Sequence, residues 1–321
     1  MKLLITGAAG FVAGHFIEYL NEYYRNWDVL CIDKNAQINK EIQYFNIHDV
    51  SFQSIDLLDT GAVRELIRDF QPDYALHLAA LSSVAASWKQ PSECIMNNTV
   101  VFLNLIESIR EICPNCRILS VGSSEEYGVV KGDDLPIHEK QALNPASPYA
   151  VARVSQEQLS RIYVKSYGIP IVLTRSFNHI GPRQDERFVV PGFIKKVLEL
   201  RSMGKNEGII ETGNVNIIRD FVDVRDVVRA YYMLLLSGKP GEAYNVCSGK
   251  RILLKSVLNI IGEEIGVSVT ARVNPKLVRP QDSPETVGTY YKMESEFGWT
   301  PTIEIQDTIH DMVLWQEKKF R

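Results

Sequence analysis

The chain has 321 residues, of which 45% are hydrophobic and 23% charged, a balance that is typical of a folded globular protein and excludes collagen-like and low-complexity classes. Its 35 basic and 39 acidic residues give a formal net charge of -4, so there is no general basic field to grip nucleic acid. No apolar run reaches the roughly 18 residues of a membrane span, and we expect neither a nucleic-acid nor a membrane partner.

The five cysteines indicate a reducing compartment. Their number is odd, and a chain of this length does not need disulfides to stabilise its core. The N-terminus MKLLITGAAG becomes glycine-rich before a signal-peptide core forms, so we expect a cytoplasmic protein. Cys113 and Cys116 form CPNC, but a zinc ribbon needs a second pair, and a strand-like segment follows. We interpret them as free thiols and expect no metal site.

Apolar runs of β type alternate with amphipathic segments through the first half of the chain. Strands are predicted in KLLIT (2–6), WDVLCID (27–33), YALHLAA (74–80), RILSVGS (117–123) and IPIVLTRSF (169–177). Helices are predicted at 11–23 and near 60–70, 92–112 and 148–167. This rhythm, with strands that are apolar throughout, predicts an α/β fold with a Rossmann-type, doubly wound parallel sheet.

Beyond about residue 178 the alternation is lost. Helices are predicted near 190–203 and 224–237, and EAYNVCSG (242–249) contains one more buried strand. We therefore assign 1–177 plus about 217–247 to the sheet domain, and 178–216 plus 248–321 to a smaller α/β substrate lobe that interleaves with it.

The segment TGAAGFVA lies directly between the first strand and the first helix. Gly7 and Gly10 permit a tight turn and the close approach of a pyrophosphate, which would sit on the N–H groups at the helix start, at Phe11 and Val12. The same glycines also suit a purely structural turn from strand to helix. Asp33 ends the second strand, where a carboxylate can bind both ribose hydroxyls and repel a 2′-phosphate. Asp33 therefore favours NAD(H), with NADP(H) as the alternative.

Further contacts to such a cofactor are expected after the next two strands. Asp56 and Leu57 follow one of them, although Asp56 can equally cap the helix that begins near Asp59. The backbone that follows the other strand comprises Leu78, Ala79 and Ala80.

Tyr149 and Arg153 stand four residues apart in SPYAVAR, at the start of a predicted helix, and so share one face. Ser123 and Ser124 follow another strand. A hydroxyl, a phenol and a cation that converge at the strand ends suit proton transfer to or from a sugar oxygen while hydride moves to or from nicotinamide. Tyr149 by itself would also suit a half-buried aromatic of a helix.

The motifs TGAAGFVA, HLAA, GSSEEYG, SPYAVAR, TRSFNHIGPRQ, RDFVDVRDV, YNVCSG and RPQDSP, in this order, resemble the extended short-chain dehydrogenase/reductase superfamily of nucleotide-sugar enzymes. The resemblance spans nearly the whole chain. Within it, GSSEEYG, FNHIGPRQ followed by FVVPGF, and RPQDSPETVG are most similar to the enzymes that reduce GDP-4-keto-6-deoxy-D-mannose to GDP-D-rhamnose in deoxysugar biosynthesis.

The resemblance implies a role for each of the matching residues. Tyr149 would be the proton donor, Ser123 the hydroxyl partner of the sugar O4, and Arg153 the cation at the nicotinamide ribose. Phe177, Asn178 and His179 would flank nicotinamide and substrate, and the further substrate contacts would be Ser124, Val189, Arg219 and Arg279. The two arginines would hold the nucleotide diphosphate, as a guanidinium fork can, or else form surface ion pairs.

Two positions depart from the pattern of the resembling family. The family has YxxxK, whereas Arg153 keeps the charge, changes the geometry and cannot release a proton. Asp33 discourages the NADPH that biosynthetic reductases of this group commonly use. The chain therefore fits an NADH-dependent reductase, or an enzyme that recycles a bound NAD.

Other activities stay open. Glu125 occupies the position of the elimination base in related 4,6-dehydratases, so a redox-neutral dehydratase is an alternative, and a 4-epimerase is another. Both must first oxidise the sugar, which requires Tyr149 to start as a phenolate, whereas a reductase starts with the phenol. This difference favours reduction. A catalytically weak NAD-binding sensor would keep the glycine turn, but the intact Ser123 and Tyr149 argue against it.

The resemblance also implies a homodimer built on two helices of each subunit, near 92–112 and 148–167. Their apolar stripes comprise Val100, Leu103, Ile106, Leu159, Ile162 and Tyr163. The same stripes would also serve simply to cover the sheet.

Overall fold

The computed structural model describes residues 1–24, 26–35, 50–278 and 283–320. The chain divides into two compact units, each built from three segments. The first unit comprises 1–126, 143–176 and 228–244, and the second comprises 127–142, 177–227 and 245–321. Two segments expected in the sheet domain, 127–142 and 217–227, belong to the second unit. They are anchored there by bonds that a sequence pattern does not reveal, including Tyr127 Oη to Asn245 Oδ1 (2.7 Å) and a bond of the buried Asp223 to helix α11 (Ile305–Phe320).

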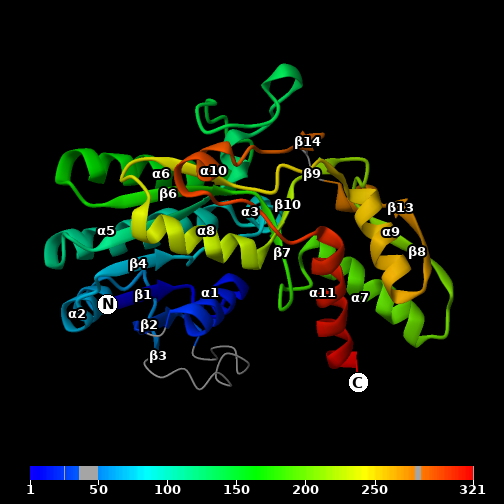
Figure 1. The fold of residues 1–321 in the computed structure, drawn as a ribbon, viewed down its shortest axis with the longest axis horizontal. Coiled ribbons are helices and arrows are strands. Elements are labelled where there is room, and N and C mark those ends of the chain that lie inside the picture. Colours follow the sequence, from blue (N-terminus) through cyan, green and yellow to red (C-terminus); the bar gives the residue numbers. More distant parts are fainter. Residues whose placement is uncertain (25, 36–49, 279–282, 321) are drawn as a thin grey trace. The chain divides into compact units, whose positions relative to one another are not determined.

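The first unit is built on a seven-stranded sheet in the order β11-β6-β5-β4-β1-β2-β3. Figure 1 labels β6, β4, β1, β2 and β3 of this sheet. The pairs from β6 to β3 are parallel, as expected of strands that are buried on both faces. The strands are β1 (Lys2–Thr6), β2 (Asp28–Asp33), β3 (Val50–Ser54), β4 (Tyr74–His77), β5 (Arg117–Ser123), β6 (Ile171–Ser176) and β11 (Ala243–Val246). The predicted Rossmann-type architecture is confirmed.

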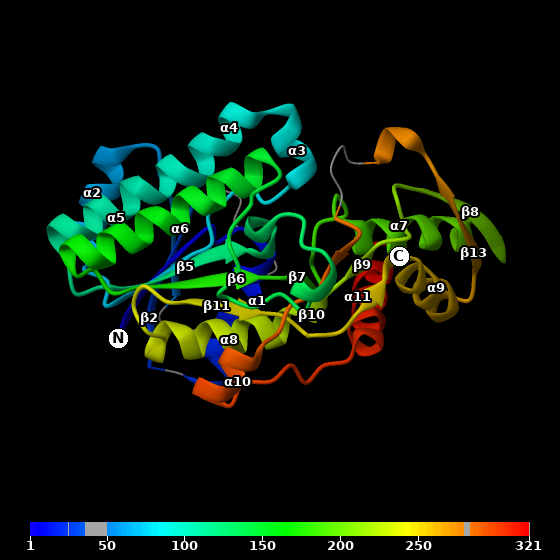
Figure 2. The same ribbon diagram turned by 90° about the horizontal axis from the view of Figure 1, so that it is seen from above.

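Helices cover both faces of this sheet. The helices are α1 (Phe11–Tyr23), α2 (Thr60–Phe70), α3 (Val84–Lys89), α4 (Pro91–Ile95), α5 (Val101–Ile112), α6 (Pro148–Tyr167) and α8 (Val224–Ser237). Figure 2 shows α2, α5 and α6 on one face, where their apolar side chains join those of the strands in one core, and α8 on the other. Tyr19 of α1 contacts Tyr232 of α8 with ring centroids 5.7 Å apart.

The helix predicted near 92–112 is interrupted. A π-helical turn, η2 (Met96–Val100), separates α4 from α5, and α3 precedes them as a separate short helix. The buried Asn98 lies within this turn, and its side chain bonds both backbone groups of Leu81, at 2.7 and 3.2 Å. Extra residues of this kind in a helix often mark functional sites, and this one holds the segment that follows β4.

The second unit surrounds a core of its own, formed mainly by α7, α9 and α11. Its helices are α7 (Val189–Ser202), α9 (Leu254–Ile265), α10 (Tyr291–Phe297) and α11 (Ile305–Phe320), and its short helical turns are η4 (Gly132–Asp134) and η5 (Pro275–Leu277). Its strands form the pairs β10-β7 and β13-β8 and the trio β12-β9-β14. They are β7 (Asn178–Ile180), β8 (Glu207–Thr212), β9 (Ile218–Arg219), β10 (Phe221–Asp223), β12 (Ile252–Leu253), β13 (Ser268–Val273) and β14 (Glu285–Thr286).

No helix in the described part of the chain is both long enough and apolar enough to cross a membrane.

Candidate active site

The turn between β1 and α1 depends on glycine at its first position. Gly7 has φ +71°, and a Cβ there would lie 2.7 Å from the backbone nitrogen of Ala79. Gly10 is the N-cap of α1 and forms no side-chain cap, so no side chain blocks the start of the helix. A tight glycine turn leading to an uncapped helix N-terminus fits the pyrophosphate of a dinucleotide.

Replacing Gly7 with alanine tests this close approach. We expect Gly7→Ala to lower the free energy of unfolding by about 2 to 4 kcal/mol, because the new Cβ meets backbone and the positive φ is strained. Dinucleotide affinity should fall with it. Denaturant unfolding and cofactor titration measure the two effects. Gly61→Ala is the matched control, since that helical glycine has a negative φ and only one ordinary contact, at 3.4 Å. Equal behaviour of the two variants would contradict the role given to Gly7.

Asp33 lies at the end of β2 and faces this turn. Its Oδ2 accepts a hydrogen bond from Ala9 N at 3.1 Å, and its Oδ1 accepts one from Asn35 N at 2.9 Å. The side chain is half-buried, so part of the carboxylate remains accessible. The carboxylate is therefore oriented beside the glycine turn, and its contact with a ribose stays a prediction.

The end of β4 is joined to β1 by polar side chains. Thr6 Oγ1 accepts a hydrogen bond from Ala79 N at 3.2 Å and lies 2.9 Å from His77 Nδ1. Burial, aided by the positive charge of Arg153, lowers the pKa of His77 to about 3, so its ring is neutral. These contacts hold Leu78, Ala79 and Ala80 at the edge of the sheet, as the sequence predicts.

The segment after β3 separates the roles of its two aspartates. Asp59 is the N-cap of α2 and accepts a bond from Ala62 N at 3.0 Å. Asp56 is exposed and accepts one from Leu58 N at 2.9 Å, while the side chain of Leu57 is buried in the core. Asp56 therefore does not cap the helix, and its binding role stays a prediction.

Tyr149 and Arg153 are in direct contact on the first two turns of α6. Both are buried, with exposed fractions of 6% and 5%. Arg153 Nε donates to Tyr149 Oη at 3.2 Å, and the guanidinium carbon lies 5.3 Å from the centre of the phenol ring. Ser147 caps the helix and Pro148 is its first residue, which explains why the helix begins here.

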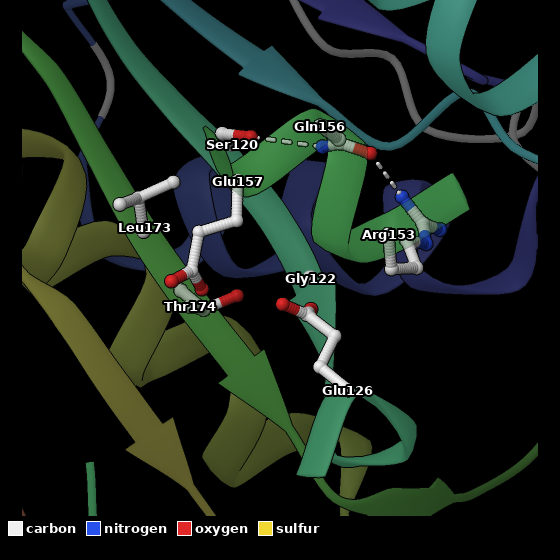
Figure 3. A pocket seen from close by; sticks show the side chains of 8 residues that line it. All are labelled: Ser120, Gly122, Glu126, Arg153, Gln156, Glu157, Leu173 and Thr174. Atoms are coloured by element: carbon white, nitrogen blue, oxygen red, sulfur yellow. Dashed lines mark hydrogen bonds between the residues drawn. The ribbon is translucent and has the colours of Figure 1, made fainter. Parts of the chain in front are cut away.

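Arg153 is held in place by β5 and by its own helix. Its Nη1 donates to Val121 O at 2.9 Å and to Gln156 Oε1 at 2.7 Å, and Gln156 Nε2 in turn donates to Ser120 Oγ at 2.8 Å. Figure 3 shows Gln156 between Ser120 and Arg153. Within the described residues nothing accepts from Nη2 of Arg153, so its two N–H groups remain for a ligand such as the nicotinamide ribose.

Ser123 ends β5, and the next residues turn into η3 (Ser124–Tyr127). The Oγ of Ser123 accepts a hydrogen bond from Glu125 N at 3.2 Å, and its backbone N–H donates to Glu126 Oε1 at 2.7 Å. Ser124 is buried, whereas Glu125 is half-buried. The helix that carries Tyr149 is connected to the strand that ends at Ser123 by the hydrogen bond from Arg153 to Val121 O.

Four of the predicted nicotinamide and substrate residues lie in the second unit. Phe177 is buried, with its ring against Gly288, where a Cβ would lie 2.5 Å from the ring. His179 Nδ1 lies 3.1 Å from Phe177 O, and burial lowers the pKa of this histidine. Asn178 and Val189, which begin β7 and α7, are exposed.

The structure describes one of the two arginines that are predicted to bind diphosphate. Arg219 in β9 is half-buried, and its Nη1 donates to Ile218 O at 2.9 Å and to Ser283 O at 2.8 Å. Arg279 lies outside the described residues. The neighbouring Asp220 is fully buried. It accepts bonds from the N–H groups of Ser248 and two glycines, so this part of RDFVDVRDV stabilises the second unit.

Several residues that support the site were not predicted from the sequence. Thr6, His77 and Asn98 fix the segment after β4, Gln156 holds Arg153, and Glu126 holds Ser123. Gln156 follows Arg153 by three residues, so the two side chains are neighbours on the helix, and this spacing could have indicated their contact. Asn98 is a polar residue in an apolar helical stretch, which is a weaker signal. Glutamate side chains are rarely buried, so no pattern in the sequence indicated that Glu126 would be.

A Rossmann-type sheet whose β5 and α6 carry a serine, a tyrosine and a cation defines the class of protein, a short-chain dehydrogenase/reductase. The sequence profile described as GDP-mannose 4,6 dehydratase matches residues 4–312, and the chain belongs to this family. The predicted kinship with nucleotide-sugar enzymes is thus confirmed.

Known relatives differ in their activities and cofactors. The GDP-6-deoxy-D-mannose reductase of Pseudomonas aeruginosa is 27% identical over 320 residues, which cover 100% of this chain and 98% of the relative. The structure of RMD from Pseudomonas aeruginosa complexed with NADPH has a TM-score of 0.85 and 26% identity, and covers 99% of both chains. A UDP-glucose 4-epimerase from Thermus thermophilus in complex with NAD has a TM-score of 0.85 and 28% identity over 99% of both chains. These relatives include a reductase and an epimerase, and structures with NADPH and with NAD, so the likeness shows the family and does not single out one reaction or cofactor.

Proposed function

We propose that the protein reduces the C4 ketone of a nucleotide-4-keto-6-deoxy sugar, with GDP-4-keto-6-deoxy-D-mannose as substrate and GDP-D-rhamnose as product. The contact between Arg153 and Tyr149 carries this proposal. Because the phenol oxygen accepts a hydrogen bond from Arg153 Nε, the phenol O–H is left to point at a substrate. The buried guanidinium then stabilises the negative charge that remains on the oxygen after proton donation.

The residues of this chain divide the work of the reduction. Reduced nicotinamide, when bound, supplies the hydride that C4 accepts. Tyr149 gives its proton to O4, so that the ketone becomes an alcohol, and the hydroxyl of Ser123 hydrogen-bonds the same oxygen. Arg153 orients the phenol through Nε and offers Nη2 to the nicotinamide ribose. The glycine turn binds the pyrophosphate of the cofactor, and Asp33 binds the adenosine ribose.

A substrate panel tests the proposal directly. Purified protein is incubated with GDP-, UDP- and dTDP-linked 4-keto-6-deoxy sugars, with NADH and NADPH in separate reactions, and the sugar products are identified. We expect oxidation of the cofactor and a new C4 alcohol with the GDP-linked ketone. Turnover of intact nucleotide hexoses without net consumption of cofactor would instead indicate a dehydratase or an epimerase.

The second candidate function is that of a redox-neutral dehydratase, and the position of Glu125 favours it. Glu125 directly follows the serine pair, and its backbone N–H holds Ser123 Oγ. An elimination base is needed only in that reaction. Glu125→Gln should therefore leave ketone reduction within a few-fold of the wild-type rate, whereas it would abolish dehydration.

The proposed enzyme prefers NADH to NADPH, and Asp33 supports this preference. We expect Asp33→Ser to raise the Kd for NADH by about tenfold, which corresponds to the loss of one charge-assisted hydrogen bond. The Kd values for NADH and NADPH should become more similar. Binding titrations of both variants with both cofactors provide the measurement. Equal binding of NADPH and NADH by the wild type would mean that Asp33 does not face the ribose.

A homodimer is part of the proposal. The six residues expected at its interface differ in how deeply they are buried. Ile106 and Tyr163 are buried in the core between helices and sheet. Ile162 is 53% exposed, and Val151, three turns earlier on α6, is 44% exposed. We expect light scattering to give the mass of two chains, and Ile162→Glu to shift the protein to the monomer. A monomeric wild type at micromolar concentration would contradict this arrangement.

The remaining assignments follow from the same proposal. The second unit would bind the nucleotide sugar, with Arg219 and Arg279 at the diphosphate and a GDP-linked substrate preferred. All five cysteines are free thiols, which supports a reducing compartment such as the cytoplasm.

A further inference from the structure

Glu126 is a carboxyl group without exposure, placed directly behind Ser123. Its side chain is 0% exposed, and its Oε1 accepts the backbone N–H of Ser123 at 2.7 Å. Its Oε2 is buried, and no N–H or O–H of the described residues reaches it. Figure 3 shows the carboxyl ends of Glu126 and Glu157 turned toward one another across a small pocket.

The carboxylate of Glu157, which faces Glu126, is paired with two cations of its own. The carboxylate of Glu157 is bound by Arg175, with its oxygens 2.7 and 2.9 Å from the guanidinium nitrogens, and by Arg161 at 3.1 Å. Burial raises the pKa of Glu157, but these two arginines outweigh burial and hold it below its usual range. Within the described part of the chain no cation bonds Glu126 itself, so an ionised Glu126 would face the carboxylate of Glu157.

The protonation state of Glu126 follows from these surroundings. Burial and the negative charge of Glu157 raise its pKa to about 8, although the Ser123 N–H and Arg175 act in the opposite direction. The groups that face it are Glu157 of α6, Arg175 of β6 and the neutral Thr174; Arg153, which also lines the pocket, has its Nη1 turned to Val121 and Gln156. These surroundings favour the uncharged acid at neutral pH, and the O–H of that acid would supply a donor at the buried Oε2, beside the carboxylate of Glu157.

The strand is shaped to accept this carboxyl. A Cβ at Gly122 would lie 2.4 Å from Glu126 Oε1 and 2.4 Å from Thr174 O. Only glycine therefore leaves room for Glu126 to reach the N–H of the next residue. The contact is built into both β5 and η3.

We propose that Glu126 is a positioning residue that holds Ser123 in its reactive place while it is protonated and releases it when it ionises. The neutral acid bridges the Ser123 backbone and Glu157, and so fixes the turn that carries the Ser123 hydroxyl. The ionised acid is repelled by Glu157 and loosens this turn. The inference rests on the proposed function in so far as Ser123 contacts the sugar oxygen.

Two variants separate the parts of this role. Glu126→Gln keeps an acceptor for Ser123 N–H and a donor for Glu157 but cannot ionise, whereas Glu126→Leu removes both bonds. Glu65→Gln, on the exposed surface of α2, is the matched control. For each protein, kcat and KM for ketosugar reduction are measured against pH, and the ¹H and ¹⁵N shifts of the Ser123 amide are followed through the same titration.

We expect the wild type and Glu65→Gln to lose kcat as the pH rises through about 8, the pKa of Glu126. Glu126→Gln should keep its kcat over this range, and Glu126→Leu should lower kcat by about 10-fold to 10²-fold at every pH with little change in KM, because a reacting group is displaced. The Ser123 amide should titrate with the same midpoint in the wild type and stay constant in Glu126→Gln.

An alkaline loss of kcat that persists in Glu126→Gln, or full activity of Glu126→Leu, would overturn the proposal. So would a Ser123 amide that does not titrate in the wild type. Failure of the proposed function is seen separately, because a protein that reduces no ketosugar still reports the ionisation of Glu126 through the Ser123 amide.

Discussion

Replacing Tyr149 with phenylalanine is expected to lower kcat for ketosugar reduction by about 10²-fold to 10⁴-fold, the usual contribution of a general acid. The ring would keep its buried place under Arg153, so only the hydroxyl is lost. Because that hydroxyl matters mainly in the transition state, the affinities for cofactor and nucleotide should stay nearly unchanged. Steady-state kinetics and cofactor titration measure the two effects.

Tyr167→Phe is the matched control, since that tyrosine is 55% exposed at the far end of the same helix. It should behave as the wild type. If Tyr149→Phe retained activity within a few-fold, the proton donor would be another group, with Ser123 or Glu125 as the next candidates.

Two replacements of Arg153 are expected to separate its charge from its shape. Arg153→Met removes both and should lower kcat by about 10²-fold, as loss of one donor to a developing negative charge does. Arg153→Lys keeps a charge beside the phenol and should preserve or raise ketosugar reduction, with the oxidative direction gaining more. Rates in both directions provide the measurement.

The stability of these variants should also differ from that of the wild type. Either replacement leaves Gln156 Oε1 and Val121 O without the Nη1 of Arg153, which should cost about 1 to 3 kcal/mol in the free energy of unfolding. Loss of reduction in Arg153→Lys, with the cofactor still bound, would show that the guanidinium makes a specific contact with the substrate. The substrate assignment would then need revision.

The glycine turn and the start of the Tyr149 helix were predictable because their signals are local. Gly7 stands between an apolar strand and an amphipathic helix, and only a tight turn satisfies that order of residues. Tyr149 and Arg153 share a helix face by their spacing alone, and Ser147 with Pro148 marks the helix start. These features depend on neighbours in the sequence, and the structure has them at the predicted positions.

Features that depend on distant residues were not predictable in this way. The π-helical turn contains Asn98, whose side chain bonds both backbone groups of Leu81, 17 residues earlier. Glu126 is buried because Gly122 and Glu157, from a strand and a helix, form its surroundings. The second unit collects segments from three parts of the chain, and the periodicity of each segment is the same whichever unit it joins.

The anchoring of Arg153 has a consequence for how this site can change in evolution. Gln156 and Ser120 form a chain of hydrogen bonds that ends on the guanidinium, so the arginine is one member of a set of three. A lysine introduced alone meets a glutamine whose acceptor was oriented for another donor, and a change at Gln156 alone leaves a buried guanidinium short of an acceptor. Each single step is costly although the combined change need not be, which is epistasis in its simplest physical form. A change to lysine alone is therefore expected to lower the free energy of unfolding even where it preserves activity.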